Sequence, residues 1–160
     1  MSIKVTSEAF SAGGEIPERF AWDRSPPLAW SGVPQAAKEL ALICDDPDAP
    51  SKAPWVHWVF YGIPANVKSL PEGISPQPRP DSPAGAMNGV NSWPDNNSGY
   101  RGPNPPKGNV HHYHFHIYAL DAALDLKPGL DKNGLLAAMK GHILAEGELI
   151  GTYESLGDKR

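Results

Sequence analysis

The stretch VHHYHFHIYALD carries four histidines and could do chemistry on two sides. Side chains of a β-strand alternate between its faces, so the histidines divide into two sets. One face would hold His111 and Tyr113, and the other His112, His114 and His116. Imidazoles donate hydrogen bonds, transfer protons and bind metal ions. The stretch therefore predicts two separate surfaces with different chemistry.

The second face has the spacing by which one strand can offer two or three imidazoles to a zinc or iron ion. Same-face neighbours on a strand lie about 7 Å apart, which strains a shared site. No carboxylate belongs to the pattern, and a solvated or interfacial face explains it equally well. The sequence predicts no resident metal and no cofactor. A metal-dependent enzyme using His112, His114 and His116 is the alternative.

Two further segments carry ionisable side chains. CDDPDAP sets Asp46 and Asp48 on either side of a proline, where an Asx-type turn is the ordinary explanation. PWVHWV places His57 in an apolar strand, where a histidine is commonly a hydrogen-bonded core residue. Asp46, His57 and His111 would also suit a phosphoester hydrolase as acid, base and orienting group. No Gly-x-Ser-x-Gly motif supplies a nucleophile, so the hydrolase stays an alternative.

A sheet is needed to position these side chains. Three β-branched and aromatic runs are expected to be its central antiparallel strands: residues 39–45, 56–63 and 110–120. Apolar residues at helical spacing predict one late helix within residues 129–144: Leu135, Leu136, Met139 and Ile143. The alternation in residues 148–156 predicts a last strand. Proline accounts for 18 of the 160 residues, which argues against a helical bundle.

The segment between residues 71 and 109 is rich in Pro, Gly, Asn and Ser and has almost no apolar periodicity. A loop of this length in a compact domain is usually functional or disordered. Its last part, GYRGPNPPKG, leads directly into the histidine strand. Rigid loops of this composition hold backbone N–H groups in place for an anion.

Composition narrows the class of partner. The formal net charge is −4, from 14 basic and 18 acidic residues, without a long run of like charge. This argues against nucleic acid and favours small molecules or proteins. The length fits one domain, residues 1–160. No signal-like segment and no run of about 18 apolar residues occurs, which predicts a cytoplasmic protein without a transmembrane segment. The single cysteine, Cys44, is expected to be a small buried hydrophobe.

The chain resembles the phosphatidylethanolamine-binding protein family, in particular its bacterial and archaeal branch, which is Raf-kinase-inhibitor-like. The motifs occur in order along nearly the whole chain: IPERFAWDRSPPLAWSGVP, DPDAP with a downstream HW, GYRGPNPPKG, HHYHFHIYALD and AMKGHILAEGELIGTYE. The resemblance implies a mainly β, antiparallel, β-sandwich-like fold with a short C-terminal helix. It also implies a small anion-binding pocket at one end of the sheet.

Carried over position by position, the resemblance places these residues in the pocket: Asp46, Asp48, His57, Pro105, Pro106, His111 and Tyr113. The implied ligand is a phosphate-like or phosphoethanolamine-like group, bound by a protein that is not an enzyme. Some family members imply a role as inhibitor or regulator of a kinase or protease, and a homodimer is a further expectation. The chain departs from the family pattern at Asn104 and in NSWPDNNSGY, which should alter the pocket rim.

The chemistry of such a pocket follows from its residue types. Protonated histidines would give an anion charge-assisted hydrogen bonds, and Tyr113 would add a hydroxyl. Asp46 and Asp48 repel a dianion. We therefore expect them to orient the histidines, to accept hydrogen bonds from the backbone of a loop, or to contact the amine of an ethanolamine-like ligand. A carboxylate beside His57 or His111 should raise the pKa of that ring, whereas burial lowers it. We expect the effect of the carboxylate on the histidine pKa to outweigh the effect of burial.

Overall fold

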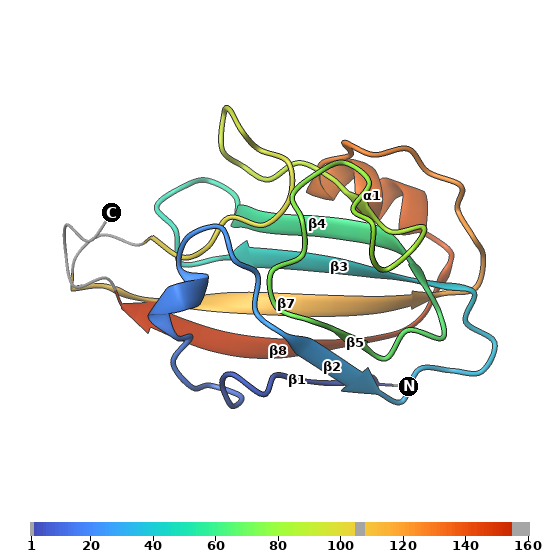
Figure 1. Cartoon of the computed structure of the whole chain (residues 1–160), viewed down its shortest axis with the longest axis horizontal. Helices are drawn as coiled ribbons and strands as arrows, with labels where there is room; N and C mark the ends of the chain where they lie inside the picture. The colour runs from blue at the N-terminus through green and yellow to red at the C-terminus, as the bar shows by residue number, and fades with distance from the viewer. Residues whose placement is uncertain (1, 105–107, 155–160) are drawn as a thin grey trace.

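The computed structural model describes residues 2–104 and 108–154, and within them the chain forms two antiparallel sheets and one α-helix (Figure 1). The larger sheet consists of β3 (Glu39–Asp46), β4 (Trp55–Pro64), β6 (Met87–Asn88), β7 (Val110–Leu120) and β8 (Ile143–Glu154). Its strand order is β6-β4-β3-β7-β8. The smaller sheet has the order β1-β2-β5, from β1 (Lys4–Thr6), β2 (Leu28–Ser31) and β5 (Ser69–Leu70). A short 3-10 helix, η1, spans Glu18–Phe20.

The main core lies between the two sheets, which confirms the expected sandwich-like, mainly β fold. Alternate residues of β3, β4 and β7 turn one face toward the smaller sheet, which Figure 1 shows in front of β7 and β8. Fully buried members of this core include Leu42, Phe60 and Phe115, and β2 contributes Trp30. Cys44 is also buried there as a free thiol, as expected. The predicted central strands are thus confirmed, each within two residues of its predicted ends.

The helix α1 (Lys132–Met139) covers part of the other face of the larger sheet. Its buried Leu135 and Met139 pack against apolar side chains of β3 and β4. The helix ends well before residue 144, because Gly141 has a φ of 83° and turns the chain into a strand. The assignment of Ile143 to the helix was therefore wrong, and β8 begins at Ile143 instead of residue 148. The strand extends to Ile143 because this residue pairs with Leu120 at the end of β7.

The long segment between β5 and β7 contains only β6 as a named strand in its described part, as its composition predicted. Two buried asparagines hold it in place. Asn88 accepts a hydrogen bond from Trp58 Nε1 and donates to the carbonyls of Ser75 and Gln77. The side chain of Asn91 donates to the carbonyl of Gly99 and accepts from the backbone N–H of Trp93, which forms an Asx turn. These side-chain amides add to the short backbone pairing of β6 with β4.

The outer edge of β8 is covered by the N-terminal segment, residues 2–16. Backbone N–H groups of Ile3, Gly13 and Ile16 donate to carbonyls of β8, and Thr152 N donates back to Gly14. These bonds are intermittent, so only isolated bridges connect the segment to the strand. Because β8 ends the strand order, its edge would otherwise be open.

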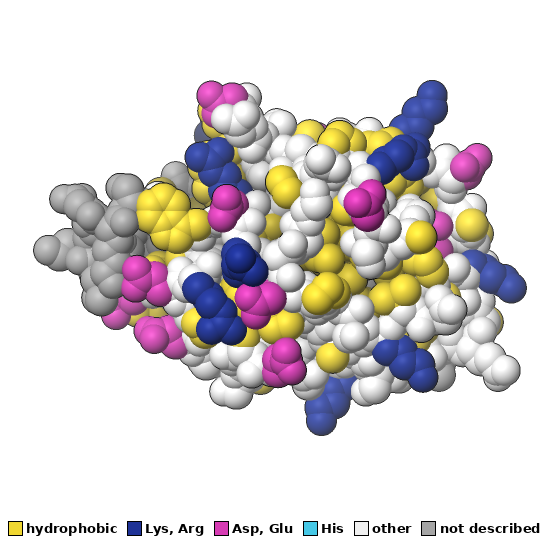
Figure 2. Space-filling model, viewed as in Figure 1, with side chains coloured by type: hydrophobic (Ala, Val, Ile, Leu, Met, Phe, Trp, Pro, Cys, Tyr) yellow, Lys and Arg dark blue, Asp and Glu magenta, His cyan; other side chains and the backbone are white. Residues whose placement is uncertain are grey.

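Surface charges on the face shown in Figure 2 are mixed in sign, with apolar side chains between them. This face carries no large patch of one charge, in line with the small net charge of the sequence. Among the described residues, no helix has the length and apolar character needed to cross a membrane.

Candidate functional site

A cavity of about 350 Å³ opens at the end of the larger sheet where β3 ends and where β4 and β7 begin. Antiparallel neighbours bring these strand ends together, so residues far apart in sequence share one wall. The cavity is lined by Asp46, Ala49, Pro50, Ser51, Trp55, His57, Trp93, Asn104, His111 and Tyr113. A cavity of this size suits a small organic ligand.

The β7 strand delivers two of these residues in the way its sequence predicted. His111 and Tyr113 are buried on one face, whereas His112 is exposed and His114 and His116 are half-buried on the other. The alternation follows from the period of two in an extended strand. The predicted division of the histidines into two faces is thus confirmed.

Asp46 links a turn and a histidine in the cavity wall. Its Oδ2 accepts a hydrogen bond from His111 Nδ1 at 2.6 Å, and both side chains are buried. Its Oδ1 accepts from the backbone N–H of Asp48 at 2.8 Å, which is an Asx turn. One carboxylate therefore closes the turn and orients a histidine. Because His111 uses Nδ1 for Asp46, Nε2 is the ring nitrogen left for a ligand.

His57 reaches the cavity through a β-bulge. Cys44 lies opposite Trp58 and Asp45 opposite Val56, so His57 has no partner in the register between β3 and β4. Bulges turn one side chain away from the regular alternation and are frequent beside functional sites. The bulge explains why His57 lines the same cavity as Asp46 and His111.

The ring of His57 also fixes the loop that precedes β7. Its Nδ1 donates to the carbonyl of Arg101 at 2.6 Å, and Arg101 N donates back to the carbonyl of His57 at 2.9 Å. Two aromatic rings, Trp93 and Tyr113, meet the imidazole edge-on, each with centroids 5.1 Å apart. The ring is thus a hydrogen-bonded core residue that forms part of the cavity wall.

Burial lowers the pKa of His57 to about 4, and neither the hydrogen bond to Arg101 nor the charge of Asp46 compensates for it. The expectation that a carboxylate would outweigh burial was therefore wrong for the pKa of His57. The reason is geometric, because Asp46 is hydrogen-bonded to His111 instead. At neutral pH His57 is uncharged, and with its proton on Nδ1 it presents Nε2 as a hydrogen-bond acceptor.

The remaining predicted pocket residues differ in their placement. Tyr113 lines the cavity, but Asp48 is not among the residues that line it. The Asp48 carboxylate instead accepts from the backbone N–H and the Nδ1 of His112, both at 2.8 Å. Pro105 and Pro106 lie outside the described residues.

Sequence reasoning missed one tryptophan of the cavity wall, Trp93. Trp93 comes from the segment NSWPDNNSGY, is held by the Asx turn at Asn91, and packs edge-on against Trp55 with centroids 5.4 Å apart. The Arg101 guanidinium lies 4.9 Å from the centre of the Trp93 ring. Because Trp93 and Asn104 line the cavity, both departures from the family pattern fall on its wall. The Asx-turn pattern at Asn91 was the available signal.

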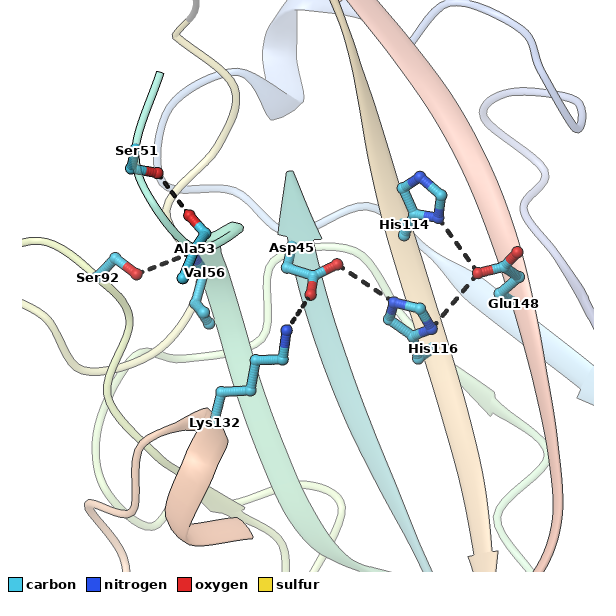
Figure 3. A network of polar contacts seen from close by, with 9 residues as sticks. All are labelled: Asp45, Ser51, Ala53, Val56, Ser92, His114, His116, Lys132 and Glu148. Carbon is cyan, nitrogen blue, oxygen red and sulfur yellow. Dashed lines mark hydrogen bonds and ion pairs between the residues drawn. The ribbon is translucent and has the colours of Figure 1, made fainter. Parts of the chain in front are cut away.

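A second group of ionisable side chains lies on the opposite face of β7 (Figure 3). Glu148 Oε2 lies 3.2 Å from His114 Nδ1 and 3.4 Å from His116 Nδ1. This grouping differs from the predicted alternative set, because His112 pairs with Asp48 and Glu148 takes its place.

Comparison with known proteins gives one consistent result. The sequence model of the phosphatidylethanolamine-binding protein family matches residues 6–154. A UPF0098 protein of Methanothermobacter thermautotrophicus is 49% identical over 157 residues, covering 94% of this chain and 98% of the relative. The crystal structure of Escherichia coli YbcL, described as a member of the mammalian PEBP family, has a TM-score of 0.87 at 30% identity, covering 97% and 99% of the two chains. A phosphatidylethanolamine-binding protein homologue of Chlamydia trachomatis has a TM-score of 0.83 at 39% identity, covering 96% and 98%.

Proposed function

Because the chain belongs to the phosphatidylethanolamine-binding protein family, we propose that its cavity binds a small phosphate-like or phosphoethanolamine-like group without chemical turnover. The observation that carries this proposal is the buried pair of Asp46 and His111 in the cavity wall. A buried, hydrogen-bonded ionisable pair beside an open cavity is typical of a binding site.

His111 is the residue that we expect to contact the anion. Its Nδ1 donates to Asp46, so an imidazolium form would offer its Nε2–H to a ligand oxygen. A hydrogen bond from a charged donor contributes about 1.5–3 kcal/mol. The carboxylate fixes the orientation of the ring.

The charge balance of the cavity favours a weakly charged or zwitterionic ligand over a dianion. Its described lining contains no Lys or Arg, and it contains the carboxylate of Asp46. A second negative charge on the ligand would therefore meet repulsion without a matching cation. An ammonium group on the ligand would instead be attracted to Asp46, and neutral His57 would accept a hydrogen bond from a protonated oxygen or amine. Phosphoethanolamine combines these groups.

The apolar part of the wall suits the carbon chain of such a ligand. Trp55 and Trp93 form an edge-on pair at the cavity, and Tyr113 lies next to His57. Aromatic side chains contact methylene groups over a large area at small conformational cost. We therefore expect O-phosphoethanolamine to bind more tightly than inorganic phosphate.

Isothermal titration calorimetry at about pH 6 tests the proposal with O-phosphoethanolamine, inorganic phosphate and ethanolamine as separate ligands. Replacing His111 by alanine should weaken phosphoethanolamine binding by roughly tenfold to hundredfold, the loss of one charge-assisted donor. His112→Ala is the matched control, because this neighbour lies on the opposite, exposed face of β7. Equal affinities of the wild-type protein and the His111→Ala variant would reject the assignment.

Turnover is tested with the same proteins. Release of phosphate from a monoester faster than in buffer, and lost on His111→Ala, would support the alternative hydrolase that uses Asp46, His57 and His111. A kinase or protease as protein partner stays an expectation from the family resemblance, since nothing in the cavity geometry depends on it.

A further inference from the structure

The outer face of β7 and β8 holds a second cluster that is independent of the cavity. His114 and His116 lie on the same side of β7, and Glu148 lies directly opposite His116 in the register with β8. Directly opposite residues of an antiparallel pair have neighbouring side chains. The strand pairing therefore adds to the two histidines the carboxylate that the HxHxH pattern lacks.

The separations within the cluster suit a shared metal ion. Glu148 Oε2 lies 3.2 Å and 3.4 Å from the Nδ1 atoms of His114 and His116, and one ligand atom from each residue lies within 4.8 Å of the others. Zinc bonds of about 2.0–2.1 Å in a tetrahedron place ligand atoms about 3.3 Å apart. The two distances to Glu148 already match this geometry.

The third separation requires a small rotation of the rings. The two imidazoles are stacked with centroids 5.8 Å apart and planes inclined by 18°. Their lone pairs must converge on one ion, which rotation about the outer side-chain bonds allows. Since the side chains of His114 and His116 are 23% and 25% exposed, they have room to turn.

Asp45 is a second observation that points to a metal ligand. Its Oδ1 lies 3.2 Å from His116 Nε2, and its Oδ2 accepts from Lys132 Nζ at 2.6 Å (Figure 3). A carboxylate accepts hydrogen bonds, so His116 donates from Nε2 to Asp45, and Nδ1 is the ring nitrogen that faces Glu148. Metal-binding histidines almost always donate their second nitrogen to a carboxylate or carbonyl in this way.

Asp45 is well suited to this positioning role. It is 5% exposed. Its two carboxylate oxygens contact His116 Nε2 and Lys132 Nζ. The carboxylate thus fixes the ring whose Nδ1 faces Glu148. His116 Nδ1 and Glu148 Oε2 lie 3.4 Å apart and face each other, so both atoms can bind one cation placed between them.

We propose that His114, His116 and Glu148 bind one divalent transition-metal ion, such as Zn²⁺, with a remaining coordination position open to water. Two imidazoles and one carboxylate select such ions over Mg²⁺ and Ca²⁺, which prefer oxygen ligands. The expectation of no resident metal rested in part on the missing carboxylate, and Glu148 removes that objection.

The test uses metal-free intact protein, titrated with Zn²⁺ by calorimetry and with Co²⁺ by visible absorption. We expect one ion per chain and a visible absorption spectrum typical of Co²⁺ with a low coordination number. His114→Ala and Glu148→Gln should each weaken Zn²⁺ binding by more than about tenfold, and Asp45→Asn by about tenfold to hundredfold. His112→Ala, on the same face but paired with Asp48, is the matched control and should bind normally.

Two results would overturn the proposal. One is the absence of stoichiometric Zn²⁺ binding below millimolar concentration. The other is binding that survives both His114→Ala and Glu148→Gln, which would place the ion elsewhere. The Glu148 side chain is 45% exposed, so these surface variants should fold, and far-ultraviolet circular dichroism checks this. Their phosphoethanolamine affinity should be unchanged, which separates this cluster from the cavity.

Discussion

Replacing His57 by glutamine should flatten the acid side of the stability profile. The folded protein holds His57 buried and neutral, with its pKa lowered to about 4, whereas the unfolded chain binds the proton at the ordinary value of about 6.5. Between these two values the unfolded state binds more protons than the folded state. The free energy of unfolding therefore falls as the pH decreases through this window.

The magnitude follows from the width of the window. The pKa of His57 changes from 6.5 to about 4, and each pH unit corresponds to about 1.4 kcal/mol, so acidification should remove about 3 kcal/mol of stability. His57 is only 3% exposed, so solvent screening reduces this value little. Since small domains are stable by about 5–15 kcal/mol, the effect is large enough to measure.

Urea unfolding at steps from about pH 7 to pH 4 measures this effect in the wild-type protein and in His57→Gln. Glutamine keeps a donor that can reach the carbonyl of Arg101, which His57 Nδ1 contacts in the wild-type protein. All other titrating groups are shared, so the difference between the two curves isolates His57. Tyr113→Phe, which alters the same cavity wall and keeps the histidine, should retain the full acid dependence.

The unfolding free energy of the wild type minus that of His57→Gln should decrease by about 3 kcal/mol from neutral pH to pH 4, because only the wild type loses the contribution of His57. Parallel curves over this range would refute the reasoning. A ring resonance of His57 that titrates near 6.5 in the folded protein would refute it directly.

Three further predictions concern the wall of the cavity and the core. Trp93→Ala removes a ring 5.1 Å from His57 and admits water, so the pKa of His57 should rise from about 4 toward 6.5 in an NMR titration. Asn88→Leu leaves the Trp58 indole N–H and two carbonyls unpaired, which should lower the free energy of unfolding in urea by at least about 2 kcal/mol. Leu135→Ala should cost about 2–5 kcal/mol in the same assay, because Leu135 is fully buried between helix and sheet.

The features that the sequence predicted well are those with a local cause. The alternation in β7 depends only on the period of a strand, so the separation of His111 and Tyr113 from the other histidines followed directly. The central strands were also predictable, because β-branched and aromatic residues are concentrated in them. The long segment before β7 was predictable because its proline and glycine residues interrupt regular structure, and β6 is the one named strand of its described part.

The features that the sequence did not predict depend on pairing between distant segments. The bulge at His57 is a property of the register between β3 and β4, and no local pattern reveals it. The partner of Asp46 and the position of Glu148 beside His116 are likewise set by register. The strands β1, β2 and β5 have at most four residues each, which is too short for periodicity to identify them. The pKa of His57 was wrongly predicted for the same reason, since its burial and partners come from the tertiary structure.

The N-terminal cover on β8 has a consequence for synthesis of the chain. Backbone N–H groups of Ile3 and Ile16 donate to carbonyls of Glu146 and Thr152, so the start of the chain covers the edge of its last strand. A ribosome makes the N-terminal segment first, and this segment waits without its partner until β8 has emerged. In a shortened chain that lacks residues 2–16, the edge of β8 has unpaired N–H and C=O groups. Such an edge recruits strands from other molecules, so loss of this segment should promote aggregation before it affects the cavity.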